Sequence, residues 1–104
     1  MTEKQFDEFK TRILPELTAL LKELQKDIGD EYRAYEDDEE PGMHITIATD
    51  DSLKSWGYQT GDNSFTGACY HYPYWGIGAL YRETDCAELA SELIESLTDV
   101  MEFD

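Results

Sequence analysis

The chain of 104 residues carries 24 acidic and eight basic side chains, which gives a formal net charge of −16. This length is typical of one domain with a single modest core, and an aromatic content of 12% is too high for a disordered acidic tail. The charge argues against direct contact with nucleic acid or an anionic membrane surface, because both contacts need a basic surface. We therefore expect one folded domain over residues 1–104, with a basic protein as its partner.

The sequence also indicates in which cellular compartment the protein is expected. It contains no apolar run of membrane-spanning length, and its first residues begin an amphipathic pattern instead of a basic and apolar leader. Two cysteines, Cys69 and Cys86, are more typical of free thiols than of a disulfide framework. These features predict a cytoplasmic protein with no membrane partner.

Residues 2–28 are predicted to form a helix, because apolar side chains recur at the three- and four-residue spacing of one buried face. These side chains are Phe6, Phe9, Ile13, Leu17, Leu20, Leu21, Leu24 and Ile28. Thr2 and Gln5 fit a capping box, and Gly29 fits the position just past the end of the helix. Pro15 either kinks the helix or starts a second one, since proline breaks a helix interior but fits a first turn.

The segment after this helix is interpreted as a short strand followed by a loop. Gly29 and Asp30 interrupt the helical pattern, so a strand around Tyr32 and Tyr35 is favoured over a last helical turn. Five consecutive acids at residues 36–40 predict a loop, because like charges do not pack together.

Strands are predicted over much of the middle of the chain. Residues 43–49 alternate apolar and polar side chains and are rich in β-branched residues, which is typical of a strand. A turn at 50–52 then leads to a second strand from Trp56 to about Thr60. Residues 67–82 are predicted to form two strands or one bent strand.

A second helix is predicted to begin after Asp85, since Asp85 with Glu88 three residues later is typical of an N-terminal cap. Its apolar stripe comprises Cys86, Leu89, Ala90, Leu93, Ile94, Leu97, Val100 and Met101. The element order α-β-β-β(β)-α predicts a small α+β domain. In this fold, two helices pack on one face of an antiparallel sheet of three or four strands.

The second helix also carries a row of acids opposite its apolar stripe, here called the acidic stripe. Its members are Asp85, Glu88, Glu92, Glu95, Asp99 and Glu102. Like charges at this spacing cost a helix roughly 0.2–0.5 kcal/mol per pair. No Lys or Arg follows Arg82 in the sequence. Carboxylates about 5 Å apart along a helix axis are comparable in spacing to the charges of a nucleic-acid backbone.

The acidic stripe and the acidic loop together suggest a surface that occupies a basic groove meant for DNA or RNA. The acidic loop consists of Glu36, Asp37, Asp38, Glu39 and Glu40. Two structural alternatives remain open for the stripe. It is either a solvated helix face, or a face that Lys4, Lys10 or Lys22 of the first helix neutralises across the fold.

An aromatic segment over residues 55–82 provides a second candidate surface. Tyr and Trp supply rigid contact area with a polar tip, which suits protein recognition. The candidate contact residues are Trp56, Tyr58, Asp62, Asn63, Tyr72 and Trp75. On this hypothesis the protein is an interaction module that binds a protein partner or forms a homodimer. An ordinary aromatic core is the structural alternative.

No catalytic or cofactor signature is recognised in the sequence. The run that begins at Asp62 resembles half of a calcium loop, but Pro73 stands where a bidentate Glu is required. Cys69 and His71 lack the second closely spaced pair that is typical of a zinc site. We expect no metal and no cofactor, and rank an enzyme or ligand site around Asp62, Asn63 and His71 last. The leading hypothesis is a non-enzymatic nucleic-acid mimic that inhibits a basic protein.

Overall fold

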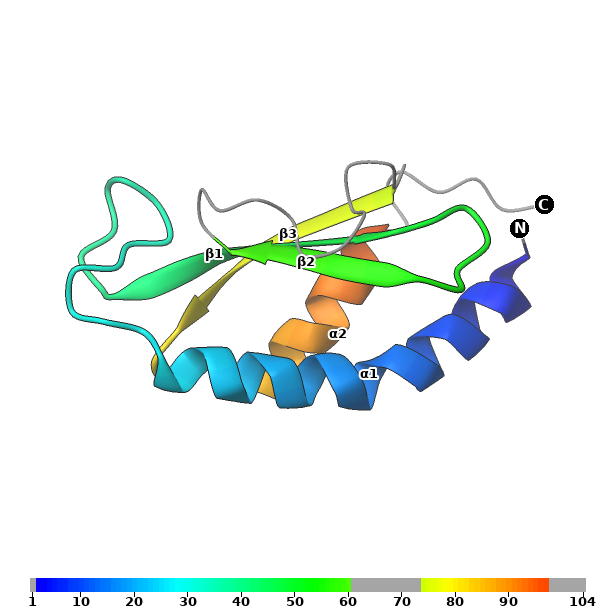
Figure 1. Ribbon diagram of the computed structural model, residues 1–104, viewed down its shortest axis with the longest axis horizontal. Helices are drawn as coiled ribbons and strands as arrows, with labels where there is room; N and C mark the ends of the chain where they lie inside the picture. Colours follow the sequence, from blue (N-terminus) through cyan, green and yellow to red (C-terminus); the bar gives the residue numbers. More distant parts are fainter. Residues whose placement is uncertain (1, 61–73, 98–104) are drawn as a thin grey trace.

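The computed structural model describes residues 2–60 and 74–97. In chain order the elements are α1 (Glu3–Lys26), β1 (Gly42–Thr49), β2 (Trp56–Thr60), β3 (Tyr74–Tyr81) and α2 (Cys86–Ser96). The strands form one antiparallel sheet in the order β2-β1-β3, and both helices lie on the same face of it (Figure 1). This arrangement confirms the predicted α+β fold class.

Helix α1 begins as the sequence predicts. Gln5 N–H donates to Thr2 Oγ1 at 3.2 Å, and Thr2 N–H donates back to Gln5 Oε1 at 2.8 Å, which completes the capping box. The helix continues through Pro15 without a break and bends near its middle (Figure 1). A kink at Pro15 is therefore the correct interpretation, and a second helix start is not.

The core lies between the helices and the sheet face that they cover. It is formed by the predicted apolar stripes of both helices together with strand side chains. Its most deeply buried members include Ile13, Leu17, Leu21, Ile45, Ile47, Leu80, Leu93, Ile94 and Leu97. Leu20 and Leu24 pack against this core as partly buried side chains. Val100 and Met101, which were also assigned to the stripe, lie outside the described residues.

Two glycines of β3 bring α2 close to the sheet. In the strand register Ile47 lies opposite Gly76, and Ile45 lies opposite Gly78. A Cβ at Gly76 would come within 3.0 Å of both the Leu93 carbonyl oxygen and Ser96 Oγ. The backbone of α2 therefore contacts the strand directly at this point, which requires a residue without a side chain.

The expected strand around Tyr32 and Tyr35 is wrong, because turns and bends occupy this segment. Side chains satisfy the local backbone there: Arg33 donates to the Asp30 and Tyr32 carbonyls at 2.6 and 2.8 Å. Tyr35 N–H donates to the Asp38 carboxylate at 3.2 Å. These bonds replace the ladder that a strand would need.

The strands predicted at 43–49 and from Trp56 to about Thr60, and the turn between them, are confirmed as β1 and β2. The turn after β1 is held by Asp50, whose Oδ1 accepts from Lys54 N–H at 3.0 Å. Of the segment 67–82, the structure describes a single strand, β3, and residues 61–73 lie outside the described part. Among the described residues, no helix has the length and apolar character needed to cross a membrane.

Candidate functional site

The structure gives the members of the acidic stripe different surroundings. Asp85 caps α2, since its Oδ1 accepts from Ala87 N–H at 3.0 Å and from Glu88 N–H at 3.2 Å. Glu88 and Glu92 are exposed, whereas Glu95 forms an ion pair with Lys10 of α1. Asp99 and Glu102 lie outside the described residues. Exposed carboxylates without an ion pair to a described residue therefore remain in the first turn and the middle of α2, at Glu88 and Glu92.

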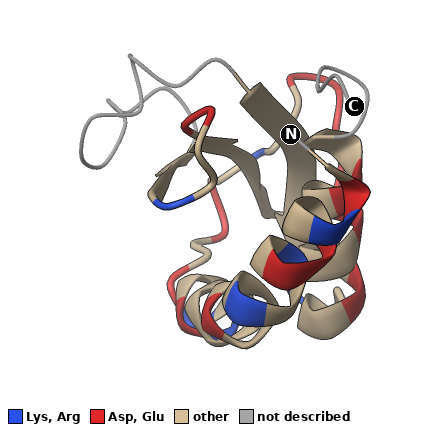
Figure 2. Cartoon of the chain, turned by 90° about the vertical axis from the view of Figure 1, so that its right-hand side faces the viewer, with Lys and Arg blue, Asp and Glu red and all other residues tan. Residues whose placement is uncertain are grey.

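The Lys10–Glu95 pair supports the alternative that α1 neutralises part of the stripe. The two side chains are 30% and 51% exposed, so the pair is screened by solvent. Lys4 and Lys22, the other cations considered for this role, form no ion pair with the described acids. Figure 2 shows the resulting distribution: basic residues lie on α1 among acids, and α2 itself contains none.

The acidic loop is anchored to the sheet through one of its five acids. Tyr81 Oη donates to Asp38 Oδ2 at 2.8 Å, and the same carboxylate accepts from Tyr35 N–H. The hydrogen bond to Asp38, with a smaller effect of burial, raises the pKa of Tyr81 to about 12. The other four acids of the loop are exposed: Glu36, Asp37, Glu39 and Glu40.

The Tyr81–Asp38 bond predicts a pH dependence at alkaline pH. Because the pKa of Tyr81 is about 12 in the fold and 10.0 in a free tyrosine, the bond stabilises fully below pH 10 and is lost as the pH rises through 12. We expect Tyr81→Phe to lower the free energy of unfolding by about 1 kcal/mol at pH 8. Urea denaturation at pH 8 and pH 11 measures this dependence. The free energy of unfolding should fall less between the two pH values in the variant than in the original protein. An equal loss in both proteins would contradict this hydrogen bond.

The described strands differ from the helices in their lack of acidic, Lys and Arg side chains. None of the described strand residues is Asp, Glu, Lys or Arg. Trp56 and Tyr58 lie on the helix side and pack against the core as half-buried side chains. On the opposite face, Trp75 and Ile77 are 40% and 57% exposed. The predicted aromatic contact residues Trp56, Tyr58 and Trp75 therefore lie on two opposite faces of the sheet.

The sheet face away from the helices also carries a pair of aromatic rings. Tyr35 lies edge-on against His44 on the face away from the helices, with ring centroids 5.5 Å apart. Asp62, Asn63 and Tyr72, the remaining members of the predicted aromatic and polar set, lie outside the described residues. Ile77 was not identified as a contact residue from the sequence. Its position between two glycines in a strand could have indicated that its side chain lies on the opposite face from the core.

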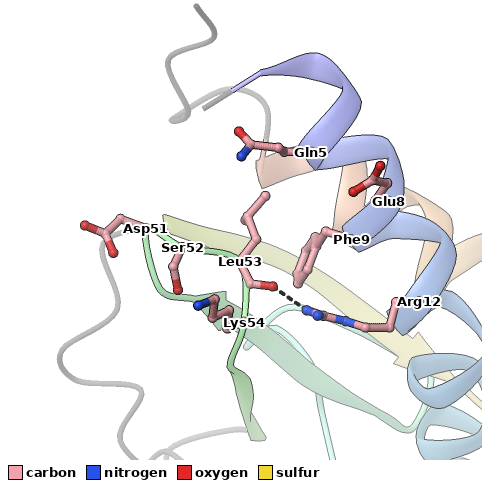
Figure 3. Close-up of a pocket in the computed structure, with 8 residues that line it drawn as sticks. All are labelled: Gln5, Glu8, Phe9, Arg12, Asp51, Ser52, Leu53 and Lys54. Atoms are coloured by element: carbon pink, nitrogen blue, oxygen red, sulfur yellow. Dashed lines mark hydrogen bonds between the residues drawn. The ribbon is translucent and has the colours of Figure 1, made fainter.

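A hollow of about 560 Å³ lies between α1 and the turn after β1 (Figure 3). It is lined by Gln5, Glu8, Phe9, Arg12, Asp51, Ser52, Leu53 and Lys54. Arg12 points to the turn and donates to the Leu53 carbonyl, and its guanidinium carbon lies 5.6 Å from the Phe9 ring centroid. Leu53 has a left-handed backbone, with φ of 59°. Two acids and two bases line the hollow, and the hydrogen bond from Arg12 to Leu53 fastens the turn to the helix.

The cysteine of α2 is a packed residue. Cys86 is buried, and its thiol donates to Gln25 Oε1 at 3.5 Å. Burial raises the pKa of this thiol, and the opposing influence of Lys22 is smaller. Burial and the raised pKa both disfavour the thiolate form that a reactive cysteine needs. In the described part of the chain no three His, Cys, Asp or Glu residues are placed to hold a metal ion, and Cys69 and His71 lie outside that part.

Comparisons with known proteins add no functional information. The chain matched no protein-family model, no curated protein and no solved structure. Any function must therefore be argued from the surfaces described above.

Proposed function

We propose that this protein is a non-enzymatic acidic binding domain that occupies the basic, nucleic-acid-binding surface of a partner protein. The observation that carries the proposal is the group of exposed acids on α2 and the acidic loop. Glu88, Glu92 and four acids of the loop form no ion pair with any described residue. Exposed carboxylates attract a basic groove over a distance that salt screening limits to about 10 Å at 0.1 M.

The structure refines which acids a test should change. Asp85 and Asp38 hold the fold through hydrogen bonds, and Glu95 pairs with Lys10, so a reversal of these three would mix binding with stability. The side chains of Glu39, Glu88 and Glu92 are exposed and form no ion pair or hydrogen bond with another described residue. They are the positions at which charge can be reversed while the fold is kept.

The test is affinity capture from a lysate of the source cell or its host at low and high salt, with the captured proteins identified. We expect a nucleic-acid-binding protein that is released at high salt and displaced by DNA or RNA. The variant Glu39→Lys/Glu88→Lys/Glu92→Lys should reduce this capture at least tenfold.

A matched control separates local charge from total charge. Asp7→Lys/Glu16→Lys/Asp27→Lys reverses three exposed acids of α1 and its C-cap, and so changes the net charge equally. We expect it to retain most of the capture. Circular dichroism should show both triple variants folded. Undiminished capture by the first variant, or equal loss in both, would contradict the proposal.

A second candidate function is favoured by the uncharged sheet. A partner protein or a second copy that contacts the face carrying Ile77 would bind through apolar area, which salt weakens little. In the same capture experiment this candidate predicts a salt-resistant partner that Ile77→Lys loses. The salt dependence and the position of the sensitive residue thus separate the two candidates.

A further inference from the structure

An apolar groove runs between the middle of α1 and the first turn of α2, and it borders the acidic stripe where Lys10 pairs with Glu95. Its volume is about 630 Å³, within the range of about 300–1,000 Å³ that is common for small-molecule sites. It is lined by Lys10, Thr11, Leu14, Pro15, Thr18, Ala19, Lys22 and Ala87. No carboxylate is among these residues, although the chain has 24 acids.

The floor of this α1–α2 groove follows from the helix pattern. Its α1 residues recur every three or four positions and form a second face beside the buried stripe. Leu14 is half-buried, Pro15 and Ala19 are exposed, and Ala87 adds an exposed methyl group from α2. Leu14 packs in part against the core, and the exposed remainder of this floor offers further apolar contact.

The two ends of the groove differ in charge. Lys10 at one end is held by Glu95, so its charge is compensated. Lys22 lies twelve residues further along α1, about 18 Å away at the rise of an α-helix. Lys22 is exposed and forms no hydrogen bond or ion pair with a described residue. The groove therefore ends at an uncompensated cation.

We propose that the α1–α2 groove binds a small amphiphilic anion, with the apolar body on Leu14, Pro15 and Ala87 and the carboxylate at the Lys22 ammonium. Charge complementarity carries this choice of ligand. A chain with a net charge of −16 repels anions over most of its surface. An anion is retained where a local cation and apolar contact act together, and the groove combines both.

The experiment uses octanoate and its uncharged counterpart 1-octanol as probes. Each is titrated into the ¹⁵N-labelled full chain at pH 7, and amide shifts are followed by NMR. We expect octanoate to shift the amides of Thr11, Thr18, Ala19 and Ala87. It should bind about two- to fivefold more tightly than octanol, as expected for one exposed ion pair. Shifts confined to other residues, or no preference for octanoate, would overturn the proposal.

Two variants and a control test the role of Lys22. Lys22→Gln should remove the preference for octanoate while octanol still binds. Lys26→Gln, which removes an exposed cation one turn further along α1 and outside the groove, should keep it. Ala19→Glu places a carboxylate on the exposed floor with a good helix former and should abolish octanoate binding. If Lys22→Gln still bound octanoate more tightly than octanol, the proposed contact between the carboxylate and Lys22 would be wrong. The proposed inhibitor function does not depend on either result.

Discussion

Replacement of Gly76 by alanine is expected to lower the free energy of unfolding by about 3 kcal/mol, a large part of the stability of a small domain. The new Cβ would lie within 3.0 Å of the Leu93 carbonyl oxygen and Ser96 Oγ. These two atoms are fixed, because Ser96 Oγ donates to the Leu93 carbonyl at 2.7 Å within the helix. Helix α2 must therefore move away from the sheet in the variant. Urea denaturation measures the resulting decrease in the free energy of unfolding.

Two other glycines provide graded controls. At Gly78 a Cβ would meet the ends of the Leu93 and Leu89 side chains, at 2.9 and 3.2 Å, and these can shift. At Gly29 the nearest atom belongs to the exposed Glu31 carboxylate, at 3.4 Å. We expect the loss to decrease from Gly76→Ala to Gly78→Ala, with little change for Gly29→Ala. Equal stability of the Gly76 and Gly29 variants would contradict the contact of α2 with β3.

The second large effect is expected for Leu17→Ala, which should lower the free energy of unfolding by about 2–5 kcal/mol. Leu17 is completely buried in the core, so truncation leaves a cavity that the surrounding helices and strands fill only in part. Leu20→Ala is the matched control, because it removes the same atoms from a partly buried position of the same helix. Chemical denaturation should show a clearly smaller loss for Leu20. Equal losses would mean that α1 presents a different face to the core.

Much of the fold was predictable because its signals are local. The spacing of Phe6, Phe9, Ile13, Leu17 and Leu21 identifies the buried face of α1 from the sequence alone. The caps at Thr2 and Asp85 and the alternation in β1 are equally short-range. The error at Tyr32 and Tyr35 has a physical cause, since Arg33 and Asp38 satisfy the backbone by side-chain bonds that no periodicity reveals.

The surfaces were less predictable, because their state depends on contacts between distant residues. The helical spacing correctly placed Glu88 and Glu92 on an exposed face of α2. It left open whether α1 neutralises the stripe, which depends on Lys10 lying beside Glu95, 85 positions away. The α1–α2 groove likewise depends on how two helices cross. The sequence did contain one indication of this groove, namely three apolar residues of α1 beside the buried stripe: Leu14, Pro15 and Ala19.

The absence of charged residues from the described strands has a consequence for how separate copies of the chain behave. In the described part of the chain the acids lie outside the strands, so repulsion between copies does not come from the strands. Strand β3 forms an edge of the described sheet, and its exposed Ile77 is flanked by glycines. Such an edge is prone to pair with another chain. As the carboxylates become protonated toward the isoelectric point near 4.2, repulsion disappears and the strand is unchanged. We therefore expect the acids of α2 and of the connections to limit aggregation through the sheet in neutral solution, whatever partner the protein binds.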